Sequence, residues 1–489
     1  MSNRVFASID EAKDYLYSQF GKDESYDVCI KDLHVKSLPI LIVYISGLVD
    51  GTATTVQLTP LFFDHQEDEK FSELDVDVEN EDKYFDDHFN FYGKSEPKDR
   101  EEFMIGVLAG QVGIITLHGY GYLLELRSYP GRQPDEPDNE KVIRGSRDGF
   151  AENIMLNSAL IRRRIRDPQL RFELHKITTI GHTDVAICYM KDIVNKKHLK
   201  WVQKRLEEIK HDGLTMADKS LEEWLFKQKF HPLPFVRYSE RPDIVAAHLL
   251  EGHIAIIVDT SPSVIVVPIS LFHLLQHAEE YRQAPFVGSF TRLLRYLAAF
   301  FSLTLLPIWY LLATHDQYLP DAIDFIGAKE ESSVPLFLQI IIANLGLEYL
   351  RIAAIHTPTP LSTAMGLVAG IIIGQIAIDV GLFSAEIVLY SAITAIFTFT
   401  IPTYELSSAV KYFQFIILLG TVIAGPSGFF IGIFIVFSYL CSLKPMTVPY
   451  MWPLVPFFPK AFLRVFIRFP MADDALRPYI VGAKQRKRI

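Results

Sequence analysis

The sequence predicts an α+β N-terminal region of two subdomains, soluble in character, followed by an all-α bundle of transmembrane helices. Two observations support this prediction. Of the 489 residues 49% are hydrophobic, yet charges are dense up to about residue 285 and nearly absent from 290 to 441. In addition, β-like apolar runs occupy the first part, whereas long uncharged runs occupy the second. A chain of this length is expected to form two or more domains.

The first subdomain is expected over residues 1–149. Ser8 and Glu11 form a capping-box pattern, which predicts a helix over 12–20. Strands are expected at 26–35, 38–45, 105–117 and 120–129, the last two joined as a hairpin at His118-Gly119. Between them, residues 64–102 hold sixteen acidic and five basic side chains. We interpret this run as a solvated acidic loop, because it lacks the spacing of a calcium-binding loop. Its charge argues against nucleic acid as a partner.

The second subdomain is expected over residues 150–285. A helix at 151–165 ends in four arginines, Arg162, Arg163, Arg164 and Arg166. The helix dipole explains a cationic last turn, and the alternative is contact with acidic lipid or with an acidic neighbour. The other expected elements are a strand at 184–190, helices at 196–210, 221–228 and 244–250, and a hairpin of 252–259 with 264–267.

No constellation of catalytic or metal-binding residues stands out in the sequence. It contains no Gly-rich phosphate loop and no nucleophile elbow, and its three cysteines are far apart. His248 and His253 are five residues apart across a helix end, and we interpret them as exposed polar residues. We therefore expect no enzymatic activity, no cofactor and no bound metal.

The membrane region is expected over residues 289–442. The uncharged run at 293–313 would be about 31 Å long as a helix, enough to cross a bilayer core. Arginines precede this run and acidic residues follow it, so its start is expected on the cytoplasmic side. Further spans are expected at 361–379, 385–401 and 412–441. The apolar segment at 335–348 is short, so we expect it to enter the bilayer partially or to lie at the interface.

One expected span carries glycines at every fourth position. Gly366, Gly370 and Gly374 share one helix face, which favours close packing of another helix. The alternative is that this helix lines an ion path, with polar residues at its ends. The pore-lining candidates are Thr363, Gly366, Leu367, Gly370, Ile371, Gly374, Gln375 and Asp379.

Another expected span is interrupted in its middle. Gly425, Pro426, Ser427 and Gly428 break the apolar run at 412–441, which predicts a kinked span or two half-helices. Broken helices in membranes line cavities, so this tetrapeptide is a candidate substrate site of a secondary transporter. No internal repeat supports a transporter.

The tail at 443–489 is basic and is expected at the interface and in the cytoplasm. The N-terminal residues lack an apolar core, so we expect no signal peptide and a cytoplasmic N-terminal region. Both termini then lie on the cytoplasmic side of the bilayer, and the number of crossings is even. Four full spans satisfy that condition.

Several motifs together resemble those of the A subunits of bacterial spore germinant receptors. The matching stretches are 44–50 (YISGLVD), 142–150 (VIRGSRDGF), 160–165 (LIRRRI), 240–243 (ERPD), 250–252, 256–259 and 289–295. Ser146 stands where the family usually has proline, and residues 352–356 replace a Glu-Ala-Gly sequence. These departures favour a paralogous branch over a dedicated nutrient sensor.

The resemblance implies an oligomeric, pentameric, ion-conducting complex in the spore inner membrane that releases monovalent cations or amplifies their release. It also implies a small membrane partner protein and contacts with other germination proteins. The glycine-lined helix at 361–378 would then line the pore, with a gate near Gly366, Leu367, Gly370 and Ile371. The alternatives are a secondary transporter and a non-conducting receptor or scaffold subunit.

Overall fold

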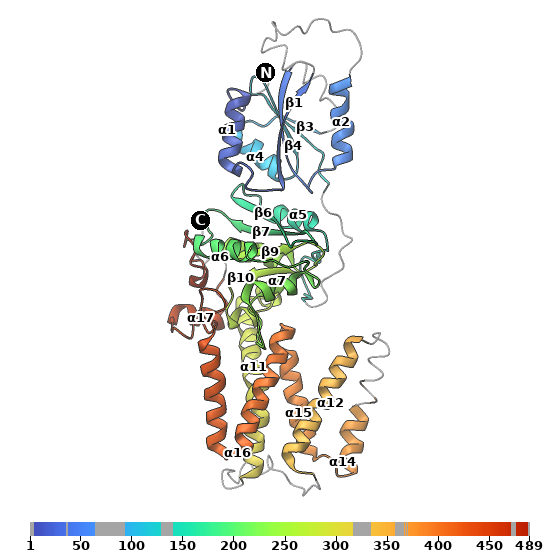
Figure 1. Cartoon of the computed structure of the whole chain (residues 1–489), viewed down its shortest axis with the longest axis vertical. Coiled ribbons are helices and arrows are strands. Elements are labelled where there is room, and N and C mark those ends of the chain that lie inside the picture. The colour runs from blue at the N-terminus through green and yellow to red at the C-terminus, as the bar shows by residue number, and fades with distance from the viewer. Residues whose placement is uncertain are drawn as a thin grey trace. The chain divides into compact units, whose positions relative to one another are not determined.

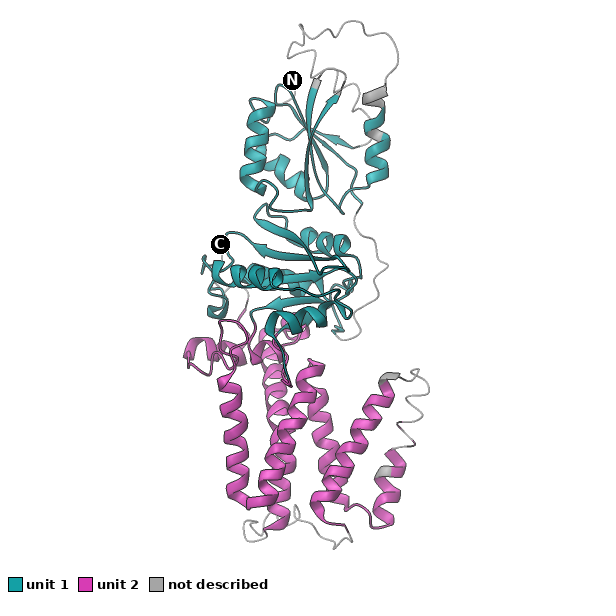
Figure 2. Cartoon of the chain, viewed as in Figure 1, with its two compact units in different colours: residues 1–229, 236–268, 471–489 teal, residues 230–235, 269–470 magenta. Residues whose placement is uncertain are grey.

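A computed structural model of the chain describes residues 4–35, 38–63, 93–128, 140–315, 334–356, 366, 368, 370–470 and 476–487. These residues form two compact units (Figure 2). Unit 1 comprises Met1–Lys229, Val236–Pro268 and Met471–Ile489, and unit 2 comprises Phe230–Phe235 and Ile269–Pro470. The N-terminal region therefore has the predicted α+β character, and its last residues come from the C-terminal tail.

Unit 1 begins with an antiparallel five-stranded sheet of order β1-β2-β4-β5-β3. Its strands are β1 (Val28–Val35), β2 (Leu38–Ile45), β3 (Lys94–Ser95), β4 (Val112–Thr116) and β5 (Gly121–Leu124). Helices α1 (Ile9–Phe20) and α4 (Arg100–Leu108) cover one face of the sheet, and α2 (Gly51–Phe63) covers the other (Figure 1). The predicted Ser8 cap is confirmed, because its side chain accepts a hydrogen bond from the Glu11 amide. The Glu11 side chain reaches back to the Ala7 amide, one residue before the N-cap, so the reciprocal bond of a capping box is not formed to Ser8.

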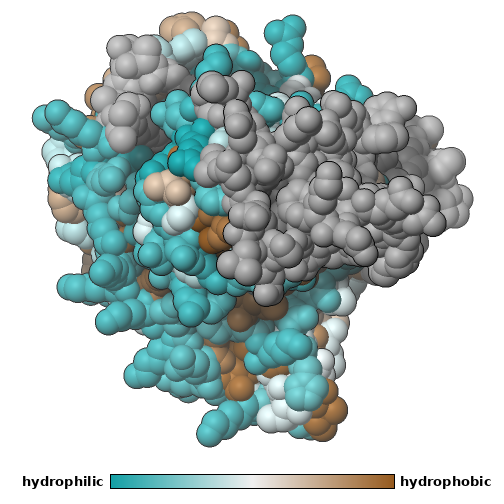
Figure 3. Space-filling view, turned by 90° about the horizontal axis from the view of Figure 1, so that it is seen from above, coloured by the Kyte–Doolittle hydropathy of each residue, from teal (hydrophilic) through white to brown (hydrophobic). Residues whose placement is uncertain are grey.

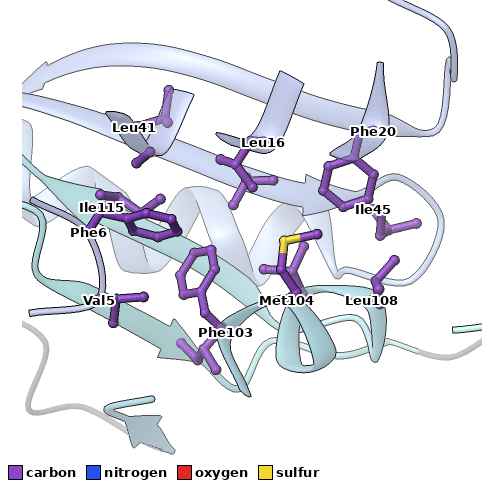
Figure 4. Packing of buried hydrophobic residues seen from close by; sticks show 14 of the residues in the cluster. Val5, Phe6, Leu16, Phe20, Leu41, Ile45, Phe103, Met104, Leu108 and Ile115 are labelled. Atoms are coloured by element: carbon purple, nitrogen blue, oxygen red, sulfur yellow. The ribbon is translucent and has the colours of Figure 1, made fainter. Parts of the chain in front are cut away.

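The core of this sheet lies between α1, α4 and the strands. Leu16 and Phe20 project from α1, and Phe103, Met104 and Leu108 from α4, toward the apolar side chains of β2 and β4 (Figure 4). All five are buried. Burial of a large apolar side chain contributes about 1.5–3 kcal/mol, so this layer fixes both helices on the sheet.

One expectation for this region was wrong, and one helix was not predicted. The strand expected to begin at Ile105 is helical as far as Leu108, because Asp99 caps the N-terminus of α4 by accepting a hydrogen bond from the Glu102 amide. Helix α2 was not expected, and it supplies Leu58 to the core on the second face of the sheet. Most of the acidic loop expected at 64–102 lies outside the described residues.

The second sheet of unit 1 is also antiparallel, with the order β6-β7-β9-β10-β8. Its strands are β6 (Leu170–Ile177), β7 (Thr183–Met190), β8 (Arg237–Ser239), β9 (Ile254–Val258) and β10 (Val264–Val267). Its helices are α5 (Ile154–Arg164), α6 (Lys196–Glu207), α7 (Ala217–Phe226) and α8 (Pro242–Glu251). The hairpin of β9 and β10 and the strand at β7 were predicted from the sequence, whereas β6 was not.

The cationic end of α5 meets acidic partners within the same chain. Arg162 is fully buried and pairs with Asp27, and Arg164 pairs with Asp148. For these two arginines, the hypothesis of an acidic neighbour is therefore correct.

Unit 2 contains the predicted helical bundle. After the short helices α9 (Leu271–Leu274) and α10 (Ala278–Arg282) come α11 (Pro285–Thr314), α12 (Leu336–His356), a helical segment that ends with η3 (Ile372–Ile376) and α14 (Ala377–Asp379), α15 (Ala385–Phe399) and α16 (Tyr404–Ser442). A shared core packs these helices together, with Trp309 of α11, Ile340 of α12, Ile387 of α15 and Leu418 of α16. Within the described residues, three helical stretches, in α11, α12 and α16, are long and apolar enough to cross a membrane.

Large apolar side chains also cover the outside of this bundle. Ile423, Phe430 and Phe434 are each more than two-thirds exposed. By contrast, the face of the chain drawn in Figure 3 is mostly hydrophilic over its described residues. Such a difference is expected when lipid replaces water around the helices of unit 2.

The segment expected to enter the bilayer partially at 335–348 is longer than predicted. Helix α12 runs from Leu336 to His356, and Leu336–Ala354 is a candidate span by length and composition. The expected segment ended at Glu348, the first charged residue after the apolar run. The structure continues the helix because Glu348 has a cationic partner, Lys411, on α16.

The single interrupted span expected at 412–441 is instead a hairpin of two helices (Figure 1). Ala424 and Gly425 leave the helical conformation, with Gly425 at φ +55°. A Cβ at Gly432 would lie 2.9 Å from Cα of Ile417. In a continuous helix, residues at that separation would be more than about 20 Å apart. The arms at 404–423 and 426–442 are therefore antiparallel neighbours, about 30 and 25 Å long.

Candidate functional site

The glycine-lined helix is described at residues 366, 368 and 370–379, whereas Thr363 and Leu367 lie outside the described residues. Gly374 lies in the π-helical turn η3, a local widening that is common at functional sites in membrane and soluble proteins. Gln375 and Asp379 follow near the end of the helix, and both are exposed. The side chains of Gln375, Asp379 and Ile371 are therefore exposed when one copy of the chain is considered alone.

The glycine face of this helix has no neighbour among the described residues. A Cβ placed on Gly366, Gly370 or Gly374 would meet no heavy atom within 4 Å. The small residues therefore do not serve close packing within the chain, over the part that the structure describes. This face is available to a second molecule or to water.

The end of the glycine-lined helix is fixed by a tight turn into α15. The amides of Leu382 and Phe383 both donate to the Ala377 carbonyl, at 2.9 and 3.1 Å. Gln339 of α12 joins the same turn, because its side-chain oxygen accepts a 2.9 Å hydrogen bond from the Ser384 amide. The turn is therefore held by α12, which was not anticipated.

A charged cluster lies between α12 and the first arm of α16. Lys411 pairs with Glu348, and Arg351 lies 3.7 Å from the same carboxylate. Arg351 also donates a 2.8 Å hydrogen bond to Ser407 and stacks over the Tyr404 ring at 4.2 Å. Ionisable residues within membrane helices are costly, and they commonly mark a polar path or a switch. Sequence reasoning noted Glu348 and Arg351 only as the end of a segment and missed Lys411.

The broken-helix candidates Gly425, Pro426, Ser427 and Gly428 form the turn and the start of the second arm of the α16 hairpin. A Cβ on Gly428 would overlap the Gly420 carbonyl. These glycines therefore allow two helix backbones to approach closely, as small residues do in membrane helix pairs. The tetrapeptide is part of a packed hairpin and is not a gap between half-helices.

A second charged cluster anchors the beginning of α11. Glu280 is fully buried and accepts a 2.7 Å hydrogen bond from Nε of Arg292, and Arg295 pairs with the same carboxylate. Arg292 also donates to the Arg464 carbonyl of α17 (Pro459–Phe466) at 3.2 Å. The amphipathic helix α17 is thereby tied to the start of α11.

Comparison with known proteins identifies the family. The family model described as "Bacillus/Clostridium GerA spore germination protein" matches residues 14–480. The chain is 44% identical to stage V sporulation protein AF of Bacillus subtilis, over 99% of this chain and 97% of that protein. It is 30% identical to spore germination protein KA of the same organism, over 99% of this chain and 89% of that protein.

Among solved structures, the chain matches the N-terminal domain of the A subunit of the Bacillus megaterium spore germinant receptor GerK3. That match has 26% identity and a TM-score of 0.41, and it covers 55% of this chain and 97% of the other. The family predicted from the sequence motifs is confirmed by the family model and by the identities to the two curated relatives. The chain is an integral membrane protein and belongs to the GerA family of spore germination proteins.

Proposed function

We propose that this chain is the membrane subunit of an oligomeric ion-conducting complex in spore germination, which releases monovalent cations or amplifies their release. Its setting is the spore inner membrane, with both termini on the core side. The complex is a homo-oligomer, a pentamer by family resemblance, and it acts with a small membrane partner and other germination proteins.

The observation that carries this proposal is the unpacked glycine face at Gly366, Gly370 and Gly374. Among the described residues this face has no intrachain neighbour, so its small residues need a reason other than packing within the chain. Copies of this helix around an axis would supply one, because glycines leave room for a lumen and the neighbouring apolar side chains can close it by dewetting. Gln375 and Asp379 would then meet water at one end of the path.

The charged cluster of Glu348, Arg351 and Lys411 supports a polar pathway in the same bundle. Its carboxylate is partly exposed and already neutralised by a cation. A cation that passes nearby would compete with Lys411 for Glu348, which couples the arrangement of α12 and α16 to conduction.

The transporter alternative depended on a substrate cavity expected at Gly425–Gly428. These residues form the turn of a closely packed hairpin, so they no longer support that alternative. A non-conducting receptor or scaffold remains the competing class. It predicts partner binding through unit 1 without ion flux.

The test is ion flux through the purified chain in liposomes, with and without its co-purifying membrane partners. Wild-type protein is expected to conduct K⁺ or Na⁺, and Gly370→Leu and Gly370→Asp are expected to change the flux by at least about tenfold through altered pore width or charge. Val368→Leu is the matched control, because Val368 is exposed and lies about 200° around the same helix.

Unchanged flux in both Gly370 variants, with wild-type assembly, would show that this face does not line the pore. A monomeric and non-conducting wild-type chain, alone and with its partners, would favour the scaffold hypothesis. Cysteine variants at 366, 370 and 374 add a second readout, since a lumen-facing thiol reacts with water-soluble reagents and blocks flux.

A further inference from the structure

Three potential metal ligands lie together in unit 1, outside the membrane region. His248 and Glu251 occupy the last turn of α8, and His253 immediately precedes β9. Between them Gly252 adopts a left-handed conformation, with φ +105°, and its amide donates to the His248 carbonyl at 3.1 Å. This turn folds His253 back toward the helix end, so a six-residue stretch supplies three donor side chains.

The distances among these side chains suit a small metal ion. Nδ1 of His248 lies 3.3 Å from Oε2 of Glu251, and Nε2 of His253 lies 3.8 Å from the same oxygen. All three ligand atoms fall within 4.8 Å of one another. Tetrahedral zinc with bonds of about 2.0–2.1 Å requires donor atoms about 3.3 Å apart. Modest rotation of the His253 ring would complete such a set.

The environment of the two histidines differs from the sequence expectation, which placed both at the surface. Both are buried, and their rings meet edge to face at 4.9 Å. The fold therefore brings two imidazole rings together beside the Glu251 carboxylate.

The local charge also permits a divalent ion. Glu251 supplies one negative charge, and its side chain is 25% exposed, which leaves an entry route from solvent. Arg237 and Arg477 are nearby cations, and Glu140 lies 3.5 Å from the Arg237 guanidinium and offsets its charge. Two neutral imidazoles and one carboxylate form a donor set that zinc uses with a fourth, exchangeable ligand.

We propose that His248, Glu251 and His253 form a binding site for a divalent transition metal of the zinc class, with its fourth position open to water. The site is independent of the proposed pore.

The site adjoins the C-terminal tail, which indicates what the metal could control. A Cβ at Gly252 would lie 3.2 Å from Cβ of Ala483, so the tail packs on the ligand-bearing turn. Arg477 also donates a 2.8 Å hydrogen bond to the Leu250 carbonyl. A metal that fixes this turn would hold the docking surface of the tail in one shape.

The test uses the full-length chain in detergent, stripped with a chelator and titrated with zinc against a chromophoric competitor. The expected result is one zinc per chain, and at least about tenfold weaker binding in Glu251→Gln and in His253→Asn. His198→Gln is the matched control, because His198 is also buried, on α6, and it should bind zinc as the wild type does.

Absence of stoichiometric zinc in the wild type, or undiminished binding in both ligand variants, would overturn the proposal. Cobalt substitution is measured on the wild-type chain, so misfolding of a variant cannot affect its result. It should give the visible spectrum of tetrahedral Co(II) without a thiolate charge-transfer band. A thiolate band would instead assign the metal to a cysteine and reject this site. Trypsin cleavage near Lys484 should slow on zinc addition in the wild type and the control only.

Discussion

Arg162 and Asp27, 135 residues apart in the chain, form a two-pronged ion pair that is fully buried, with Nε–Oδ2 at 2.9 Å and Nη2–Oδ1 at 3.0 Å. Asp27 precedes β1 of the first sheet, and Arg162 lies on α5 beside the second sheet. The neighbouring Tyr26 amide donates to the Phe172 carbonyl of β6 at 3.1 Å. The pair therefore fixes the junction of the two sheets within unit 1.

Replacement of Arg162 by leucine should destabilise unit 1 by about 3–5 kcal/mol, because it leaves the Asp27 carboxylate buried without its cation. A fall in the apparent Tm of the purified chain is the measurement. Arg163→Leu is the control, since Arg163 is exposed in the next position of the same helix. The double variant Asp27→Leu/Arg162→Met should lose less stability than Arg162→Leu alone, because no charge is left buried without a partner. An unchanged Tm in Arg162→Leu would contradict the assigned role of the pair.

Local signals in the sequence predicted much of unit 1. The Ser8 cap, the apolar run of β2 and the hairpin after Gly252 each depend on residues close together in the chain, and each is present. The Asp27–Arg162 pair could not be predicted, because nothing in a single sequence indicates which distant carboxylate meets a given arginine. Helix α2 was missed because its threonines and valine are weak helix formers that packing overrides.

The fold of the membrane region also depends on contacts that the sequence does not reveal. The apolar run at 412–441 was predicted, but its length alone did not distinguish one interrupted span from two short ones. The close approach of Gly420 to Gly428 decides the question, and it depends on backbone geometry. The histidines at 248 and 253 were predicted to be exposed because polarity was weighed without the fold that buries them.

The pairing of Lys411 with Glu348 predicts the effect of charge reversal. Lys411→Glu should reduce the yield of folded protein, because it places two carboxylates together within membrane helices and removes a contact of about 1.5–3 kcal/mol. The exchanged variant Glu348→Lys/Lys411→Glu should recover most of that yield. Size-exclusion chromatography after extraction in mild detergent measures both. Lys444→Glu, at an exposed lysine, is the control, and an exchange no better than the single change would reject the pairing.

Glycines of unit 2 should fall into two classes. Gly432→Val should lower the apparent Tm by several degrees, because its Cβ would press on the Ile417 backbone at 2.9 Å and force the α16 arms apart. Gly366→Val should leave the Tm of the dissociated chain unchanged, because its Cβ would meet no described heavy atom within 4 Å. Thermal unfolding in a detergent that keeps the chain monomeric separates the two. Equal losses in both variants would mean that the glycine face is packed within the chain.

His198 predicts a specific loss of stability in acid. Burial lowers the pKa of His198 to about 4, below the ordinary value of about 6.5 that it regains on unfolding. The unfolded state therefore binds the proton more tightly, and the contribution of the neutral ring is complete above pH 6.5. It is lost as the pH falls from 6.5 toward 4. Between pH 7 and pH 5 the free energy of unfolding should fall by about 2 kcal/mol through this residue.

The measurement is the urea midpoint at pH 7 and at pH 5, followed by tryptophan fluorescence, to which Trp201 contributes from the same helix as His198. His198→Gln should reduce the difference between the two midpoints, because glutamine does not titrate in this range. His211→Gln is the matched control, since His211 is exposed and lies beyond the end of α6. If the His198 variant keeps the full wild-type dependence on pH, a different buried group must bind the proton on unfolding.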